Sequence, residues 1–209
     1  MVNIQSMIRR LLLLILLSVP TLLTAHPHMF IDTRLKVELD GNILKRLEIT
    51  WYFDPMFTAS IVGDFDSDKN GVFTPDETEE VREYAFSNLE NYDYFTFLEL
   101  ENTTHVPQKI EDFRVFVENG QLVYRFSIPF DLPISDKSFS VAIYDDTYFC
   151  DILYHEENPV EFSGTRPADW GIVENRNMSI NYGGPVSVSR DGKEYSGTAY
   201  PQQLQVHLQ

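Results

Sequence analysis

The architecture of the chain follows from residues 29–53, "MFIDTRLKVELDGNILKRLEITWYF". Residues 29–39 alternate apolar and polar side chains, a period of two that is typical of a half-buried strand. The "DGN" of residues 40–42 is a hairpin turn signal, and residues 43–53 return as a second strand. The stretch therefore predicts an antiparallel hairpin on which a sheet is built.

Two helical segments are expected directly after this hairpin. Residues 54–65 suit a short helix, with Asp54 as its cap and Pro55 in its first turn. Residues 75–92 are expected to form the longest helix, because a proline and several acidic residues begin it. The apolar face of this longer helix is expected to consist of Val81, Tyr84, Ala85 and Leu89.

The remaining sequence indicates β-structure, with "ENGQ", "YDDT" and "RDGKEY" as turns. The strand candidates are residues 94–100, 111–128, 139–155, 178–182 and 185–189. No internal repeat or linker divides residues 26–209, so one domain is expected. The predicted fold class is α+β: a twisted antiparallel β-sheet or sandwich with one helix–calcium loop–helix, EF-hand-like, inserted after the second strand.

The first residues have the three-part pattern of a cleavable secretory signal. Arg9 and Arg10 precede an apolar run, and a short "LLTA" segment ends at Ala25. We therefore expect residues 1–25 to be a signal peptide and the rest of the chain to lie outside the cytosol. No cysteine follows the run, so no lipid anchor is expected. The alternative is an uncleaved N-terminal anchor.

The charge of the mature chain excludes some classes of partner. Removal of residues 1–25 leaves 14 basic against 32 acidic residues, a net charge of −18. Such a surface repels nucleic acid and anionic lipid and attracts cations. The single cysteine, Cys150, excludes a disulfide framework, and its apolar neighbours favour a buried strand residue over a reactive thiol.

Residues 66–77, "DSDKNGVFTPDE", match the calcium-loop pattern D-x-[DN]-x-[DN]-G-x5-E. Such a loop offers oxygen ligands from six positions and turns at a glycine, here Gly71. The predicted calcium ligands are Asp66, Asp68, Asn70, the backbone carbonyl of Val72, Thr74 and Glu77. Phe73 supplies the apolar residue expected between two helices. The alternative is a solvated acidic turn.

The calcium loop is expected to be structural. Sensors of this type usually pair two loops and expose a methionine-rich groove, and this sequence has one loop and no such helix face. A lone site outside the cytosol, where calcium is abundant, can be weak and still filled. The pattern therefore favours a calcium clamp over a calcium switch.

Two histidines are candidate ligands for a transition metal. Cleavage after Ala25 would make His26 the N-terminal residue, and its amino group and Nδ1 can chelate zinc, copper or nickel together with His28. Asp32 lies on the same strand face, and His155 is a candidate ligand from a distant segment. The alternative is that His26 and His28 are polar residues at a fraying terminus and that His155 is simply exposed.

No enzymatic activity is expected. The sequence lacks a G-x-S-x-G elbow, an H-E-x-x-H zinc helix, a phosphate-binding glycine loop and a dinucleotide fingerprint. Asp145 and Asp146 form a pair of carboxylates, but their place between two strand candidates favours a turn.

Four stretches of the sequence resemble a family of bacterial periplasmic proteins. They are "AHPHMFID" (25–32), "ITWYFDPMFTA" (49–59), the loop at 66–77 and "VAIYDDTYF" (141–149). The family is labelled as the periplasmic component of an ABC-type uncharacterised transport system, is ZevA-like and is associated with divalent metals.

This resemblance implies a periplasmic accessory of a divalent transition-metal transport system of the zinc, nickel or cobalt type, beside an inner-membrane metal permease. It assigns the metal role to His26 and His28. The alternative is a calcium-stabilised module that docks on a permease without binding transition metal.

Overall fold

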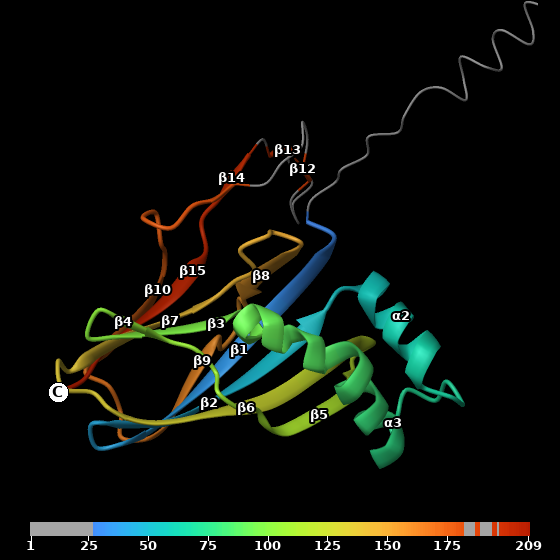
Figure 1. Cartoon of the computed structure of the whole chain (residues 1–209), viewed down its shortest axis with the longest axis horizontal. Coiled ribbons are helices and arrows are strands. Elements are labelled where there is room, and N and C mark those ends of the chain that lie inside the picture. The colour runs from blue at the N-terminus through green and yellow to red at the C-terminus, as the bar shows by residue number, and fades with distance from the viewer. Residues whose placement is uncertain (1–26, 182–186, 189–193, 196) are drawn as a thin grey trace, which may run out of the picture.

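The predicted hairpin is formed by β1 (Met29–Asp40) and β2 (Ile43–Phe53), which pair antiparallel (Figure 1). Gly41 has a φ of +58° in the turn between them, a conformation that favours glycine. Both strands lie in the middle of the larger of two sheets. The local pattern of residues 29–53 thus predicted the central pair of strands correctly.

The computed structural model describes residues 27–181, 187–188, 194–195 and 197–209. The expected signal peptide, His26 and the turn of the "RDGKEY" segment lie outside the described residues. Within the described part of the chain, no helix is both long enough and apolar enough to span a membrane.

The larger sheet has the strand order β5–β6–β2–β1–β8, and β9 also pairs with β1. Its outer strands are β5 (Glu111–Glu118), β6 (Gln121–Pro133), β8 (Cys150–Tyr154) and β9 (Val160–Gly164). The expectation of purely antiparallel pairing is wrong, because β8 and β9 both run parallel to β1. They cover successive parts of one edge of β1, and the chain reaches this edge from the other sheet. A hairpin must reverse the direction of the chain, whereas a chain that arrives from another sheet can run in the same direction as its new neighbour.

The smaller sheet is antiparallel, in the order β10–β15–β7–β3–β4. Its strands are β3 (Thr96–Leu100), β4 (Thr103–His105), β7 (Ser138–Ile143), β10 (Asp169–Glu174) and β15 (Gln202–His207). Two short antiparallel pairs accompany them: β11 (Ile180–Asn181) with β14 (Thr198–Ala199), and β12 (Ser187–Val188) with β13 (Glu194–Tyr195). The last segment of the chain is therefore integral to the fold, because β15 lies between β10 and β7.

The two sheets lie over one another, and their inward-facing side chains form the main core (Figure 1). Core residues from the larger sheet include Ile31, Leu35, Ile49, Trp51 and Phe126, and those from the smaller sheet include Leu98, Val141, Leu204 and Val206. The described residues therefore form an α+β fold in which two β-sheets enclose apolar side chains.

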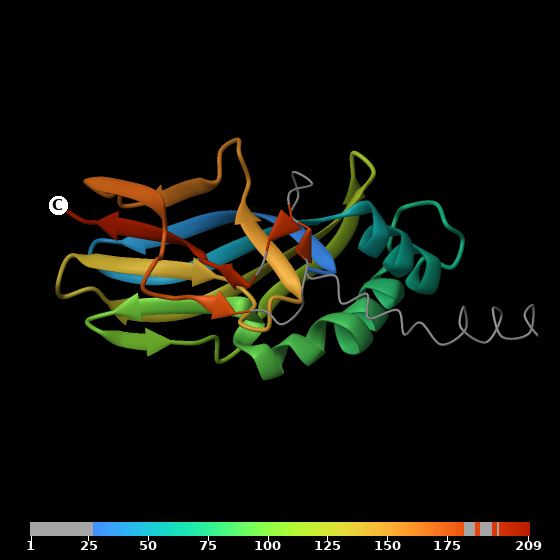
Figure 2. The same ribbon diagram turned by 90° about the horizontal axis from the view of Figure 1, so that it is seen from above.

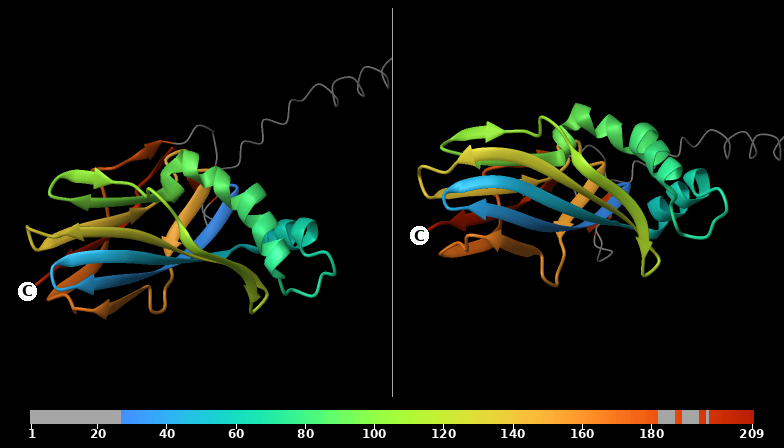
Figure 3. Two further views of the ribbon diagram at one scale, coloured as in Figure 1. Left: turned by 60° about the horizontal axis from the view of Figure 1, so that its bottom comes forward. Right: turned by 90° about the horizontal axis from the view of Figure 1, so that it is seen from below.

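The helices lie at the end of the sheets opposite the C-terminus (Figures 2 and 3). Helix α2 (Pro55–Phe65) begins at the predicted cap Asp54, and α3 (Pro75–Val81) begins at the cap Thr74. Helix α2 contacts β6 and α3 contacts β5, so both helices are held against the larger sheet. Their position after β2 agrees with the predicted insertion.

The expected long helix over residues 75–92 is interrupted. After α3 the chain forms a π-helical turn, η1 (Arg82–Phe86), and a 3₁₀ segment, η2 (Ser87–Phe95). The wider π turn changes the direction in which the following side chains point around the helix axis. Phe86 is buried and its ring stacks 4.3 Å from Phe113, whereas Tyr84, expected on the apolar face, is 64% exposed.

Candidate functional site

The predicted calcium ligand Asp66 lies at the end of α2 and is buried, with 1% of its surface exposed. Its carboxylate accepts the backbone N–H of Gly71 at 2.7 Å and that of Asn70 at 3.3 Å. Gly71 has a φ of +77°, which permits the sharp turn back towards Asp66. The first and sixth residues of the loop are thus joined by a hydrogen bond.

Glu77, the last predicted ligand, joins the two ends of the loop. One carboxylate oxygen accepts the backbone N–H of Ser67 at 2.9 Å, and the other accepts the backbone N–H of Thr74 at 2.9 Å. The Thr74 hydroxyl in turn accepts the N–H of Glu77, which completes a capping box at the start of α3. Hydrogen bonds to Glu77 therefore close the loop.

The donors of the loop suit a hard cation, but several are engaged within the protein. Asn70 donates its side-chain amide to Asp68 at 2.7 Å and accepts the Val72 N–H at 2.6 Å. In the part of the chain that the structure describes, no three His, Cys, Asp or Glu side chains are grouped as metal ligands. A cation in this loop would have to draw Glu77 away from the backbone amides that it now accepts.

The loop and its helices are attached to the body of the protein. Phe73 packs against the main core, and the buried Thr58 hydroxyl of α2 accepts the Leu122 N–H of β6 at 3.0 Å. These two contacts hold the loop region against the body of the protein.

The histidine end of the chain is described from Pro27 onwards, so the predicted ligand His26 lies outside the described residues. The His28 N–H donates to the Phe149 carbonyl at 2.8 Å, and the His28 ring lies 4.9 Å from the Phe149 ring. Residues 28 and 149, far apart in the sequence, thus lie side by side where β1 begins.

His155, a candidate third ligand from a distant segment, does not lie beside His28 in this structure. The His155 N–H donates to the Thr33 carbonyl. Thr33 of β1 comes five residues after His28, which places the two residues on the order of 15 Å apart along the strand. An Arg34 guanidinium nitrogen lies 3.3 Å from the His155 ring. Because a guanidinium repels cations, this contact also disfavours metal binding at His155.

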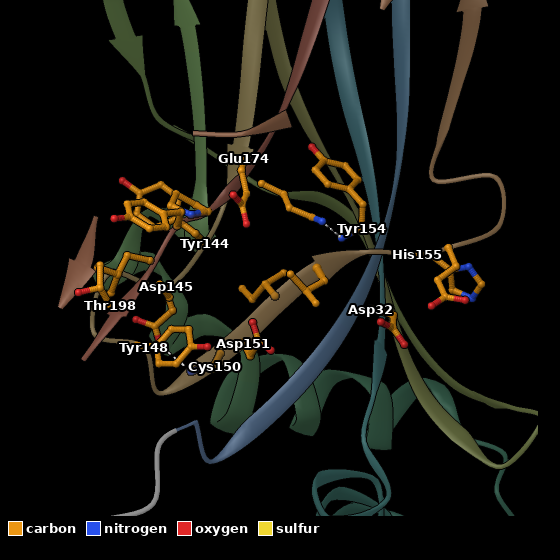
Figure 4. Close-up of a pocket in the computed structure, with 18 of the residues that line it drawn as sticks. Asp32, Tyr144, Asp145, Tyr148, Cys150, Asp151, Tyr154, His155, Glu174 and Thr198 are labelled. Atoms are coloured by element: carbon orange, nitrogen blue, oxygen red, sulfur yellow. Dashed lines mark hydrogen bonds between the residues drawn. The ribbon is translucent and has the colours of Figure 1, made fainter. Parts of the chain in front are cut away.

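A cavity of about 730 Å³ lies beside the start of β1, between β8 and the segments around β10, β11 and β14 (Figure 4). Carboxylates that line it are Asp32, Asp145, Asp151, Glu156, Glu157 and Glu174, and tyrosines that line it are Tyr144, Tyr148, Tyr154 and Tyr200. The described residues that form the lining include no Lys or Arg. This concentration of one sign of charge favours cations in the cavity.

Periodicity in the sequence did not predict the cavity, because its walls come from segments that are distant in the chain. One carboxylate, Asp145, has the turn role that its position predicted. It accepts the N–H of Thr147 and that of Cys150, both at 2.9 Å, and is buried. Asp145 therefore holds the turn that leads into β8.

A sequence model of the family described as "Protein of unknown function (DUF1007)" matches residues 11–207. The chain belongs to this family. Most of its length, including both β-sheets and the loop, thus falls within the DUF1007 match.

Two relatives of this DUF1007 chain are similar over more than half of it. An "Uncharacterized 15.5 kDa protein in trpE 3'region" of Spirochaeta aurantia is 31% identical over 124 residues, 58% of this chain and 88% of the relative. An "Uncharacterized protein" of Haemophilus influenzae is 26% identical over 143 residues, 66% of this chain and 68% of the relative. Neither name states an activity, so these similarities show a family and no function.

In this DUF1007 chain the free cysteine is structural. Cys150 begins β8 and is buried, with its Sγ 3.9 Å from the Met29 sulfur. Burial raises the pKa of the thiol, and the nearby Asp145 carboxylate raises it further. A protonated, enclosed thiol is a poor nucleophile. The prediction of a buried strand residue is confirmed.

The Glu77 carboxyl is expected to titrate at about pH 2 in the folded protein. Hydrogen bonds from the Thr74 and Ser67 amides lower the pKa of Glu77 from its ordinary 4.5 to about 2. Because the folded-state pKa lies below the unfolded value, the stabilisation is complete above about pH 4.5 and is lost as the pH falls through about 2. Carboxyl ¹³C NMR can follow the titration, with Glu77→Gln to assign the signal. A midpoint near pH 4.5 would show that these bonds do not persist in solution.

Proposed function

We propose that this DUF1007 protein is a periplasmic accessory of a divalent transition-metal transport system, of the zinc, nickel or cobalt type, that works beside an inner-membrane metal permease. The observation that supports this best is the cavity lined by six carboxylates next to the start of β1. A strongly negative cavity raises the local concentration of cations. The family resemblance and the expected signal peptide at residues 1–25 agree with this role.

The metal ligands in this proposal are the nitrogen atoms of the N-terminal end. After cleavage, the amino group and Nδ1 of His26 together with the His28 imidazole would bind zinc, copper or nickel, which favour such donors. The carboxylates of the cavity would attract the ion to this end of the molecule. The protein would carry the ion without changing it chemically, so no enzymatic step is proposed.

The mature protein that begins at His26 is expected to bind one zinc, copper or nickel ion in isothermal titration. An extra glycine before His26 should weaken binding, because the amine moves out of chelating reach. His28→Ala should weaken it as well. Affinity should fall as the pH drops below about 8 and again below about 6.5, the ordinary pKa values of an α-amino group and an imidazole.

His155→Ala is the matched control in this titration, because His155 contacts Arg34 and lies far from His28. It should leave the affinity unchanged. Equal affinity with and without the added glycine would exclude the amine as a ligand. Binding weaker than about 10 μM by the mature protein would argue against metal capture at this end.

We further propose that the helix–loop–helix of α2 and α3 is EF-hand-like and holds calcium as a structural clamp. The ligands would be the oxygens of Asp66, Asp68, Asn70, Val72, Thr74 and Glu77. Glu77 already bridges both ends of the loop through hydrogen bonds. Calcium would take over this bridging and attach it to the buried Asp66.

Millimolar calcium is expected to raise the melting temperature, and Glu77→Gln is expected to abolish that rise. Saturation at a hundred times the dissociation constant contributes about 2.7 kcal/mol. For a chain of this size this corresponds to roughly 5–10 °C. Glu80→Gln, on the exposed surface of the same helix, should respond to calcium like the wild type. Identical melting of the wild type in calcium and in chelator would refute the clamp.

A calcium-stabilised module that docks on a permease without binding transition metal is the second candidate function. The contacts of Phe73 with the core and of Thr58 with β6, which hold the loop region against the body of the protein, favour it. The transition-metal titration and the calcium melting experiment together separate the two candidate functions. A calcium-dependent rise in melting temperature without transition-metal binding at the mature N-terminus would favour the docking module.

A further inference from the structure

Asp54 connects the first strand to the first helix of the loop region. One carboxylate oxygen accepts the N–H groups of Met56 and Phe57 at 2.7 and 3.0 Å and so caps α2. The other accepts the Phe30 N–H at 2.9 Å, and the Asp54 N–H donates to the Phe30 carbonyl at 3.1 Å. A single residue therefore fixes both the start of α2 and the start of β1.

The other end of α2 is the first residue of the predicted calcium loop. The Asp66 N–H donates to the Val62 carbonyl and ends the helix, while the Asp66 carboxylate binds the loop amides. Helix α2 has 11 residues, so the two ends are about 16 Å apart. Asp54 and Asp66 therefore lie at opposite ends of α2.

A helix of this length is marginally stable by itself, so α2 depends on its contacts. These are the Asp54 cap at one end, the Asp66 loop at the other and Thr58 against β6 between them. Helix order is cooperative, and a contact that stabilises one end also raises the population of the other end in its folded geometry.

We propose that Asp54 is a positioning residue that couples the calcium loop to the histidine end. Calcium in the loop would order α2, strengthen the contact between Asp54 and Phe30, and so restrain His28 beside Phe149. The inference rests on the proposed calcium site. Coupling between two sites is reciprocal, so the contact with Phe30 must strengthen calcium binding by the same factor.

Asp54→Asn tests selectively whether the bond between the Asp54 carboxylate and the Phe30 N–H carries the coupling. Asparagine caps helices about as well as aspartate. Its single side-chain oxygen cannot cap α2 and accept the Phe30 N–H at the same time. The substitution therefore removes the bond from the Phe30 N–H to the side chain, while the cap of α2 and the backbone bond from residue 54 to the Phe30 carbonyl remain.

The experiment is amide hydrogen exchange by NMR on the full mature protein, with and without saturating calcium, together with calcium titration calorimetry. Calcium should slow exchange of the Phe30 amide by about fivefold or more, the lower range of typical couplings. In Asp54→Asn this slowing should disappear, and calcium affinity should fall by a similar factor. The amide of Ile49, central in β2 and buried, exchanges through global unfolding and reports the calcium stabilisation of the whole fold. Its calcium response should persist in Asp54→Asn, whereas that of Phe30 should be lost.

The outcomes separate the coupling from the calcium site itself. Calcium binding without any change at Phe30 would overturn the coupling and leave the calcium clamp standing. A calcium response at Phe30 that persists in Asp54→Asn would overturn the role of Asp54. No heat of calcium binding to the wild type would refute the clamp and the coupling together.

Discussion

Trp51→Ala is expected to lower the free energy of unfolding by about 3–5 kcal/mol, the usual cost of truncating a buried tryptophan. Trp51 is 0% exposed in β2, and its indole lies 4.9 Å from the Phe126 ring and 6.1 Å from the Phe95 ring. Alanine would leave a cavity between the two sheets. Thermal unfolding followed by circular dichroism should show a melting temperature roughly 6–20 °C lower.

Trp51→Phe is the matched comparison. The indole N–H is buried and has no hydrogen-bond partner among the residues that the structure describes. Phenylalanine keeps an aromatic ring and removes this unsatisfied donor, whose burial costs about 1–3 kcal/mol. Trp51→Phe should therefore lower the free energy of unfolding by only about 1 kcal/mol or less. An equal loss for both substitutions would mean that the N–H is satisfied and that packing of the whole indole is required.

Gly164→Ala is expected to destabilise the protein by about 2–3 kcal/mol. Gly164 ends β9 with a φ of +77°, and a Cβ there would lie 2.0 Å from the Leu39 carbonyl oxygen of β1. The end of β9 would have to move away from β1, with loss of the bond from Thr165 N–H to that oxygen. The left-handed conformation contributes about 1–2 kcal/mol and each lost hydrogen bond about 1 kcal/mol.

Gly41→Ala separates the steric clash from the cost of the backbone conformation. Gly41 also has a left-handed φ, +58°, but no atom lies within 4 Å of the position that a Cβ would take. It should cost only about 1 kcal/mol. Urea unfolding of the two variants measures the difference, and equal losses would disprove the contact between Gly164 and Leu39.

Much of the loop region was predictable because its geometry is local. The caps Asp54 and Thr74, the turn at Gly71 and the reciprocal bonds of Thr74 and Glu77 all join residues within six positions of each other. The length of the second helix was not predictable in this way. The demand to bury Phe86 against Phe113 of β5 introduced a π turn, and no local signal in residues 75–92 specifies that contact.

The sequence by itself determined the hairpin of β1 and β2 and the position of the two helices, because periodicity, turn residues and caps act over short distances. The tertiary structure decided the parallel pairing of β8 and β9, the separation of His155 from His28, the acidic cavity and the contact of Asp54 with Phe30. These features join segments up to about 170 residues apart, as between Asp32 and Gln202 in the cavity. Their physical cause is the packing of the two sheets as a whole, which the alternation of side chains along one strand does not specify.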